Sequence, residues 1–329
     1  MEELLKWSIM NMTKNEDAPA RPANSEPPKK LDPKIIDHII GKPVSQQMKE
    51  CMDIIDGTNS TEGGENPQPT LKDKEIAFDD LEMFVENIDN ASNLEPLELW
   101  PRIIKQLVSP EPSLRSAAAW VCGTAVQHNP NAQKAFKKHH GLKPILNVLE
   151  NDSNTEAKSK AMYCLSSYVR TNPDGFNEFI GDKNEEGARG LVILKKNLSN
   201  FTRKYRSLRI KTLFLLQALI EESEDEALKP EERIRPDFAE LVAKAGFMDC
   251  ICQFVNTVSA SDEPNSEIEI DPDYAEKALR LVALLCTRED TKSIVTSVNE
   301  LPKAVEYLEK QFPETDLSDD EEKALEILF

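Results

Sequence analysis

An internal repeat is the feature that most restricts how this chain can fold. The segment from Ser116 to Cys122 aligns with the segment from Ser159 to Leu165, 43 positions further on. Under the same offset Trp120 falls on Tyr163, Asn129-Pro130 on Asn172-Pro173, and Phe136 on Phe179. Further copies with other gaps are Phe78 to Asn90, Leu208 to Leu219 and Tyr274 to Leu285. Apolar residues recur in each copy at helical spacing, so the repeated unit is helical.

Helical units of about 40 to 47 residues are those of armadillo and HEAT solenoids, where each unit buries its apolar face only against its neighbours. Shorter helices introduced by Gly141, Gly190 and Gly246 separate the long ones, since glycine permits a close turn between packed helices. We therefore predict an all-α, armadillo-like right-handed helical solenoid of about four repeats with flanking helices over residues 71–329. Residues 1–70 are predicted to form a flexible N-terminal segment of short helices, one of them at Pro33 to Ile40, and disordered linkers. The acidic stretches Glu221 to Glu232 and Ser259 to Asp273 are predicted to be loops on the rim of the solenoid.

Composition narrows the class of protein further. The chain has 40 Lys+Arg against 59 Asp+Glu, a net charge of −19, which disfavours nucleic acid as a partner and favours a soluble monomer. No apolar run is long enough for a membrane span, and the acids at Glu2 and Glu3 do not suit a secretory signal. We therefore expect a cytoplasmic protein. Its six cysteines lack any C-x-x-C pair and are predicted to be buried, reduced thiols.

Two columns of residues occupy equivalent positions in successive repeats. The first is basic, Arg115, Lys158 and Arg209, and either suits an acidic protein partner or pairs with nearby Glu at the helix starts. The second consists of Met83, Trp120, Tyr163 and Phe214, for which burial between repeats is favoured over a binding surface.

The positions four residues after the second column are Asn87, Thr124, Ser167 and Ala218. Armadillo proteins that bind extended peptides pair the aromatic residue with an Asn, whose amide both donates to and accepts from a peptide backbone. Because that series of Asn is mostly missing here, the surface is better suited to a folded domain than to an extended peptide.

Catalytic, cofactor and metal sites find no support in the sequence. The chain has no G-x-S-x-G, no P-loop, no H-E-x-x-H and no dinucleotide fingerprint. The adjacent His139 and His140 cannot both face one metal ion from a helix. We expect no enzyme activity, no cofactor and no metal ion.

Three segments carry a family likeness: Met1 to Ile9, Phe84 to Asn93, and Ala117 to Gln127. With them the chain resembles the armadillo-type nucleotide exchange factors of the heat-shock-protein-70 chaperones, and most closely their fungal cytosolic members. The resemblance implies that the concave face binds one lobe of the chaperone's ATPase domain and displaces the other lobe, so that ADP leaves and the client protein is released. It implies no nucleotide site on this chain.

The resemblance, with the columns, gives a set of predicted partner-binding residues. They are Asn87, Asn90, Ala91, Arg115, Trp120, Thr124, Gln127, Lys158, Tyr163, Ser167, Arg170 and Arg209. The long acidic insertions depart from the family pattern and leave the edges of the later repeats open.

Two questions stay open from the sequence. The segment from Lys34 to Lys42, a short apolar core flanked by lysines, either competes with client polypeptides for the chaperone's peptide cleft or simply docks on the first repeat. The chain as a whole is either an exchange factor or a general armadillo scaffold that joins protein partners. An enzyme is the weakest alternative.

Overall fold

The computed structural model describes residues 42–58, 68–181, 189–229, 233–260 and 268–329. Contacts divide the chain into residues 1–47 and residues 48–329. The helices predicted at the first residues and at Pro33 to Ile40 lie outside the described residues, and the division of the chain at residue 70 stays a prediction. Helix α3 (Val44–Asp56) is held to α6 by Arg102, which forms ion pairs of 2.8 Å with Asp53 and 2.7 Å with Asp56.

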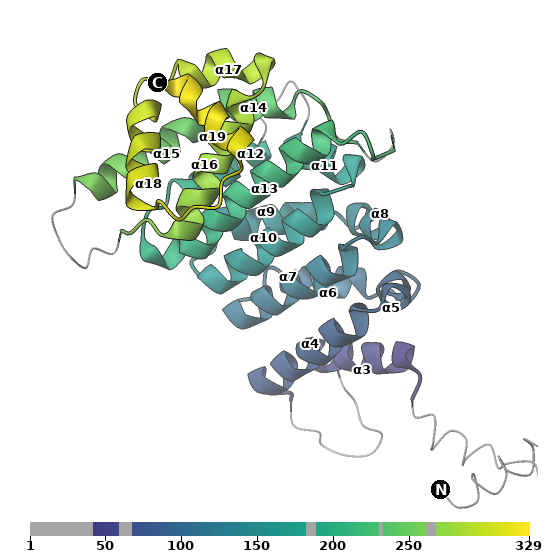
Figure 1. Ribbon diagram of the computed structural model, residues 1–329. Coiled ribbons are helices and arrows are strands. Elements are labelled where there is room, and N and C mark those ends of the chain that lie inside the picture. The colour runs from purple at the N-terminus through teal and green to yellow at the C-terminus, as the bar shows by residue number, and fades with distance from the viewer. Residues whose placement is uncertain (1–41, 59–67, 182–188, 230–232, 261–267) are drawn as a thin grey trace, which may run out of the picture. The chain divides into compact units, whose positions relative to one another are not determined.

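The helices follow one another in triplets, each made of a short, a middle and a long helix (Figure 1). Four such triplets are α5 (Ile88–Asn93), α6 (Trp100–Gln106) and α7 (Pro112–Val126); α8 (Pro130–Lys138), α9 (Leu142–Asn151) and α10 (Thr155–Val169); α11 (Pro173–Ile180), α12 (Arg189–Leu198) and α13 (Arg206–Glu224); α14 (Phe238–Lys244), α15 (Phe247–Ser259) and α16 (Pro272–Cys286). Helix α4 (Leu71–Val85) precedes them, and α17 (Glu289–Thr296), α18 (Leu301–Gln311) and α19 (Asp319–Leu325) follow. The predicted solenoid of about four repeats is therefore confirmed.

The long helices pack in sequence order, α4 on α7, α7 on α10, α10 on α13, and α13 on α16. We call these five helices the wall helices. Helices α7 and α10 have the same length, 15 residues, and start 43 positions apart, as the sequence repeat predicts. Each triplet thus contributes one helix to a continuous surface.

The repeated Phe residues explain the glycines that follow them. Phe136 and Phe179 are fully buried, and a Cβ atom at Gly141 or Gly190 would lie 2.2 Å from the respective ring. The backbone can pass the ring only where no side chain is present. Phe136 also makes edge contacts with Trp100 and Tyr168, which extends the core across three helices.

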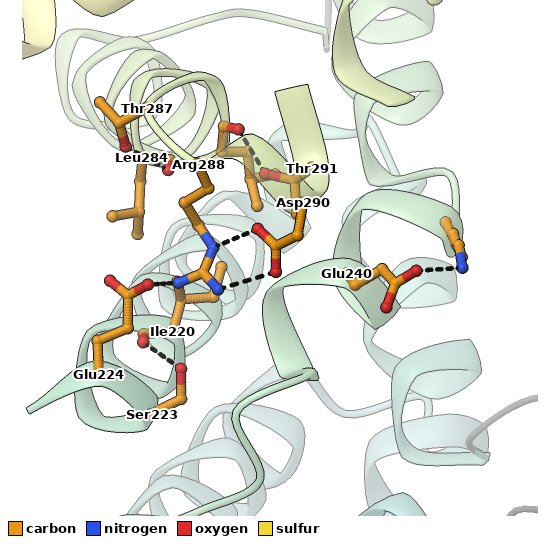
Figure 2. Close-up of polar contacts among 11 residues, drawn as sticks. Ile220, Ser223, Glu224, Glu240, Leu284, Thr287, Arg288, Asp290 and Thr291 are labelled. Atoms are coloured by element: carbon orange, nitrogen blue, oxygen red, sulfur yellow. Dashed lines mark hydrogen bonds and ion pairs between the residues drawn. The ribbon is translucent and has the colours of Figure 1, made fainter. Parts of the chain in front are cut away.

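The first acidic insertion differs from its prediction as a loop. Helix α13 continues to Glu224, so residues 221–224 are helical. Two arginines hold this extension: Arg170 binds Glu222 at 2.6 Å, and Arg288 forms ion pairs with Glu224 and Asp290 (Figure 2). Carboxylates placed against these arginines stabilise helix where the sequence shows only an acidic run.

Two further findings concern the chain as a whole. All six cysteines are free and buried, which confirms their prediction. Among the described residues, no helix combines the length and the apolar character needed to cross a membrane.

Candidate functional site

An apolar stripe runs across four wall helices at one equivalent position. It consists of Met83 on α4, Trp120 on α7, Tyr163 on α10 and Phe214 on α13. Met83 is 58% exposed and Phe214 is 47% exposed, while Trp120 and Tyr163 are partly exposed. Burial between repeats, which the sequence favoured, is therefore wrong for Met83 and Phe214. Large apolar side chains left in water on adjacent helices are typical of a protein-binding surface.

Polar side chains connect three of these helices next to the stripe. The Thr124 hydroxyl donates to the Glu82 carboxylate at 2.8 Å and lies 3.4 Å from the Tyr163 hydroxyl. Tyr163 in turn donates to Gln127 at 3.1 Å. These hydrogen bonds fix the positions of three predicted residues, Thr124, Gln127 and Tyr163.

The same residues line a groove of about 320 Å³, which we call the α4–α7 groove. Its apolar lining is Val85, Ile88, Ala91 and Ala125, and its polar lining is Glu82, Glu86, Thr124, Gln127, His128 and Tyr163. The groove therefore brings together Ala91, Thr124, Gln127 and Tyr163 from the predicted set, which come from α5, α7 with its C-terminal end, and α10. Asn87 and Asn90 lie at the start of α5, where the Asn87 side chain caps the helix.

The basic column has a different environment from the predicted one. Lys158 is 6% exposed and Arg209 is 1% exposed, so neither presents its charge on an open surface. Lys158 donates to the carbonyls of Leu149 and Glu150, and Arg209 donates to those of Asn200 and Thr202.

Arg115 donates in the same way, to the carbonyls of Ser109 and Pro110, and also forms an ion pair of 2.6 Å with Asp152. All three cations thus bind backbone carbonyls that follow the middle helix of their triplet or lie in its last turn. The periodic basic column is explained by this shared structural contact, and the expectation of an exposed column is not met.

Two lysines that the sequence analysis missed lie beside the apolar stripe. The Lys160 ammonium lies 3.3 Å from the centre of the Trp120 ring, and burial lowers the pKa of Lys160. Lys211 donates to Ser159 Oγ at 2.6 Å, and burial together with the nearby Lys160 lowers the pKa of Lys211. Within the described parts of the chain, no carboxylate oxygen lies within 4.0 Å of either ammonium. Both cations can therefore donate to an incoming acidic group.

A sequence signal for Lys211 exists. Residues 188–220 contain eight Lys and Arg and no acid, within a chain of net charge −19.

Of the other predicted residues, Ser167 lies one turn after Tyr163 on α10, and Arg170 is paired with Glu222 at the end of that helix.

The sequence analysis also missed Glu82, although this residue breaks the apolar pattern of the repeat. The residue before the stripe position is Ala119, Met162 or Leu213 in the other three helices of the stripe, all buried and apolar. In α4 the same position holds a carboxylate, which is 8% exposed. A charged residue at a core position of a repeat is informative, but a search for apolar periodicity alone does not detect it.

Comparisons with known proteins identify one protein family. Residues 1–94 match the family described as "Nucleotide exchange factor Fes1", and residues 90–326 match the "SIL1/FES1/HPBP1 C-terminal domain". The chain is 34% identical over 316 residues to the "Hsp70 nucleotide exchange factor fes1" of Schizosaccharomyces pombe, covering 95% of each chain. It is 33% identical over 226 residues to the protein named FES1 of Saccharomyces cerevisiae, covering 67% of this chain and 70% of that protein.

Solved structures add evidence on the fold alone. A designed armadillo repeat protein in complex with the peptide (KR)4 superimposes with a TM-score of 0.57 at 13% identity, covering 85% of this chain and 98% of that chain. A second designed armadillo repeat protein gives the same TM-score and identity over 87% of this chain and 100% of that chain. These likenesses support the armadillo-like architecture.

Proposed function

The chain belongs to the Fes1 family of Hsp70 nucleotide exchange factors, and we propose that it binds the ATPase domain of a cytosolic Hsp70 through the exposed face of its wall helices. Binding there accelerates the release of ADP, and with it the release of the client. The observation that carries this proposal is the apolar stripe of Met83, Trp120, Tyr163 and Phe214 on four adjacent helices. The chain itself catalyses no reaction in this proposal.

The stripe and its neighbours supply two kinds of contact. Exposed apolar side chains gain free energy when a partner covers them, at about 25 cal/mol for each Å² removed from water. Lys160 and Lys211 next to the stripe offer hydrogen-bond donors to carboxylates of the partner. Because the series of Asn residues needed for an extended peptide is mostly missing, we propose a folded domain as the occupant.

Exchange activity requires that ADP and the chain each weaken the binding of the other to Hsp70. The chain must bind the open, nucleotide-poor Hsp70 more tightly than the ADP-bound form, since equal affinity shifts no population. A coupling free energy of about 1–3 kcal/mol corresponds to a roughly 5- to 150-fold change in affinity, and ADP must weaken binding of the chain by the same factor. No residue of the chain needs to contact ADP for this linkage.

The test is stopped-flow release of a fluorescent ADP analogue from a cytosolic Hsp70, with and without the chain. Phe214→Glu places a charge in the exposed stripe and should reduce the acceleration by about tenfold or more, because burying an unpaired carboxylate at an interface is costly. Val192→Glu is the matched control, since Val192 is 56% exposed on α12 and lies outside the stripe. This control should stay within about twofold of the unmodified chain.

The general armadillo scaffold is the alternative. It predicts binding of the chain to Hsp70 without any change in the ADP release rate, so the stopped-flow experiment separates the two functions. If the unmodified chain leaves release unchanged while an established exchange factor accelerates it, the exchange proposal is refuted for that Hsp70.

We also propose a cytoplasmic monomer. Six free, buried cysteines support a reducing compartment, and the net charge of −19 supports solubility without self-association.

A further inference from the structure

The α4–α7 groove contains a carboxylate that the fold leaves short of hydrogen-bond donors. Glu82 is 8% exposed and occupies a position that is apolar in the other three helices of the stripe. The hydroxyl of Thr124 donates to Glu82 Oε1 at 2.8 Å. Among the described residues, no Lys, Arg or His nitrogen lies within 4.0 Å of this carboxylate.

That environment is unfavourable in the free protein. An ionised carboxylate accepts about four hydrogen bonds, and one hydroxyl supplies a single donor. The charge of Lys160 acts on Glu82 only from beyond ion-pair distance, and removing a carboxylate from water without a cationic partner in contact costs several kcal/mol even after relaxation. A cation placed in the groove would therefore recover interaction energy that the isolated chain does not have.

The rest of the groove indicates which cation fits. Its apolar lining, Val85, Ile88, Ala91 and Ala125, suits an alkyl chain rather than a hydrated metal ion. Glu86 follows Glu82 by one helical turn, lines the same groove and is exposed. An apolar passage with one carboxylate at the surface and another buried inside matches a long basic side chain, whose stem is apolar and whose end is charged.

We infer that the α4–α7 groove receives an Arg or Lys side chain from the ATPase domain of Hsp70, with Glu82 as the buried counter-ion. This inference rests on the proposed function and adds to it the chemistry of one contact. The wall face would then present an acidic groove at α4 and α7 and, at α10 and α13, the ammonium groups of Lys160 and Lys211, which have no carboxylate within 4.0 Å among the described residues. Two regions of opposite charge on one surface fix the orientation of the bound domain, because a reversed orientation places like charges together.

The test measures the dissociation constant of the full chain with the Hsp70 ATPase domain by biolayer interferometry at two salt concentrations. Glu82→Gln keeps the shape of the side chain and its hydrogen bond with Thr124 but removes the charge. It should weaken binding by about tenfold or more, because a buried charge in the partner loses its counter-ion. Glu314→Gln is the matched control, since Glu314 is exposed between α18 and α19 and changes the net charge equally. The control should stay within about twofold.

A second variant protects the test against a folding defect. Glu86 is exposed, so Glu86→Gln leaves the core intact, and it should weaken binding by about threefold through the loss of charge at the groove entrance. Glu82→Gln should also reduce the salt dependence of binding relative to Glu314→Gln. Substituting the basic residues of the ATPase domain one by one should identify one whose effect is not additive with Glu82→Gln.

Two results would overturn the inference. The first is that both groove variants bind as the Glu314→Gln control does; the second is that Glu82→Gln binds more tightly than the unmodified chain. Failure of the proposed function looks different, because the unmodified chain itself would then neither bind the ATPase domain nor accelerate ADP release.

Discussion

Replacing Arg209 by Ala should damage the fold rather than a surface contact. The Arg209 guanidinium donates to the carbonyls of Asn200 at 2.6 Å and Thr202 at 2.9 Å, and it lies 4.6 Å from the centre of the Phe254 ring. The side chain is 1% exposed, and burial lowers the pKa of Arg209. Its removal therefore takes a charged donor from both carbonyls; among the described residues, only the Thr202 carbonyl also accepts a hydrogen bond from a turn amide, the N–H of Tyr205 at 3.0 Å.

The magnitude follows from these contacts. Two hydrogen bonds from a charged donor contribute about 2 kcal/mol each, the ring contact about 1 kcal/mol, and burial of the two methylenes that alanine lacks about 2 kcal/mol. Relief of the buried charge returns several kcal/mol, which we take as about 4. The net destabilisation is about 3 kcal/mol, which lowers the melting temperature by roughly 6–12 °C for a domain of this size.

Circular dichroism at 222 nm during heating measures this shift. Arg209→Met is the matched control, since it keeps the apolar stem and removes the charge, and it should lower the melting temperature by less than half as much. The reasoning is refuted if Arg209→Ala melts within about 2 °C of the unmodified chain yet loses the acceleration of ADP release. That result would mean that the cation acts on the partner.

Three further predictions concern other contacts. Burial, the largest influence, raises the pKa of Asp152, but the hydrogen bond from Arg115 and its other contacts hold it below its usual value. Because a lowered carboxylate pKa contributes stability above the unfolded value near 4 and loses it as pH falls through the folded pKa, Asp152→Asn should lower the melting temperature at pH 7 by several degrees and by progressively less as the pH falls below the unfolded value. Gly123→Val should destabilise by about 2 kcal/mol in a urea titration, since a Cβ there would lie 2.7 Å from the Tyr163 ring; Gly175→Val provides a second close-packed site for comparison. Burial raises the pKa of Cys51, Cys252 and Cys286 to about 11, so a thiol reagent at pH 8 should label the six cysteines slowly in the native chain and rapidly in urea; fast native labelling would contradict their burial.

The fold was predictable because the repeat encodes it directly. An offset of 43 residues places α7 and α10 in register, and the alternation of long helices with shorter ones follows from periodicity and glycine. The environment of each side chain was less predictable, because side chains at equivalent positions of the repeat point in the same direction but have different neighbouring residues. Arg209 and Lys158 share a position that looks like a surface column, yet carbonyls in the last turn of the preceding helix bind Lys158, and carbonyls just after the preceding helix bind Arg209.

The side-chain environments of the candidate site were also only partly predictable from the sequence. Phe214 and Met83 resemble core residues by type, but the stripe position is exposed or partly exposed on all four helices that carry it. Thr124, Gln127 and Tyr163 were placed in the predicted set by resemblance, and the structure joins them through hydrogen bonds that no spacing rule describes. Glu82 accepts a hydrogen bond from Thr124 at a position that is apolar in the other three stripe helices, and a search for regular spacing does not detect such an exception.

The contact between Lys160 and Trp120 gives the chain an optical reporter. Indole emission depends on nearby charges, and here an ammonium lies 3.3 Å from the ring centre on the exposed stripe. Trp100, by contrast, is fully buried and makes an edge contact with Phe136. These two of the chain's three indoles therefore sense different events: Trp100 follows unfolding of the core, while Trp120 follows any ligand that draws the ammonium away from its ring.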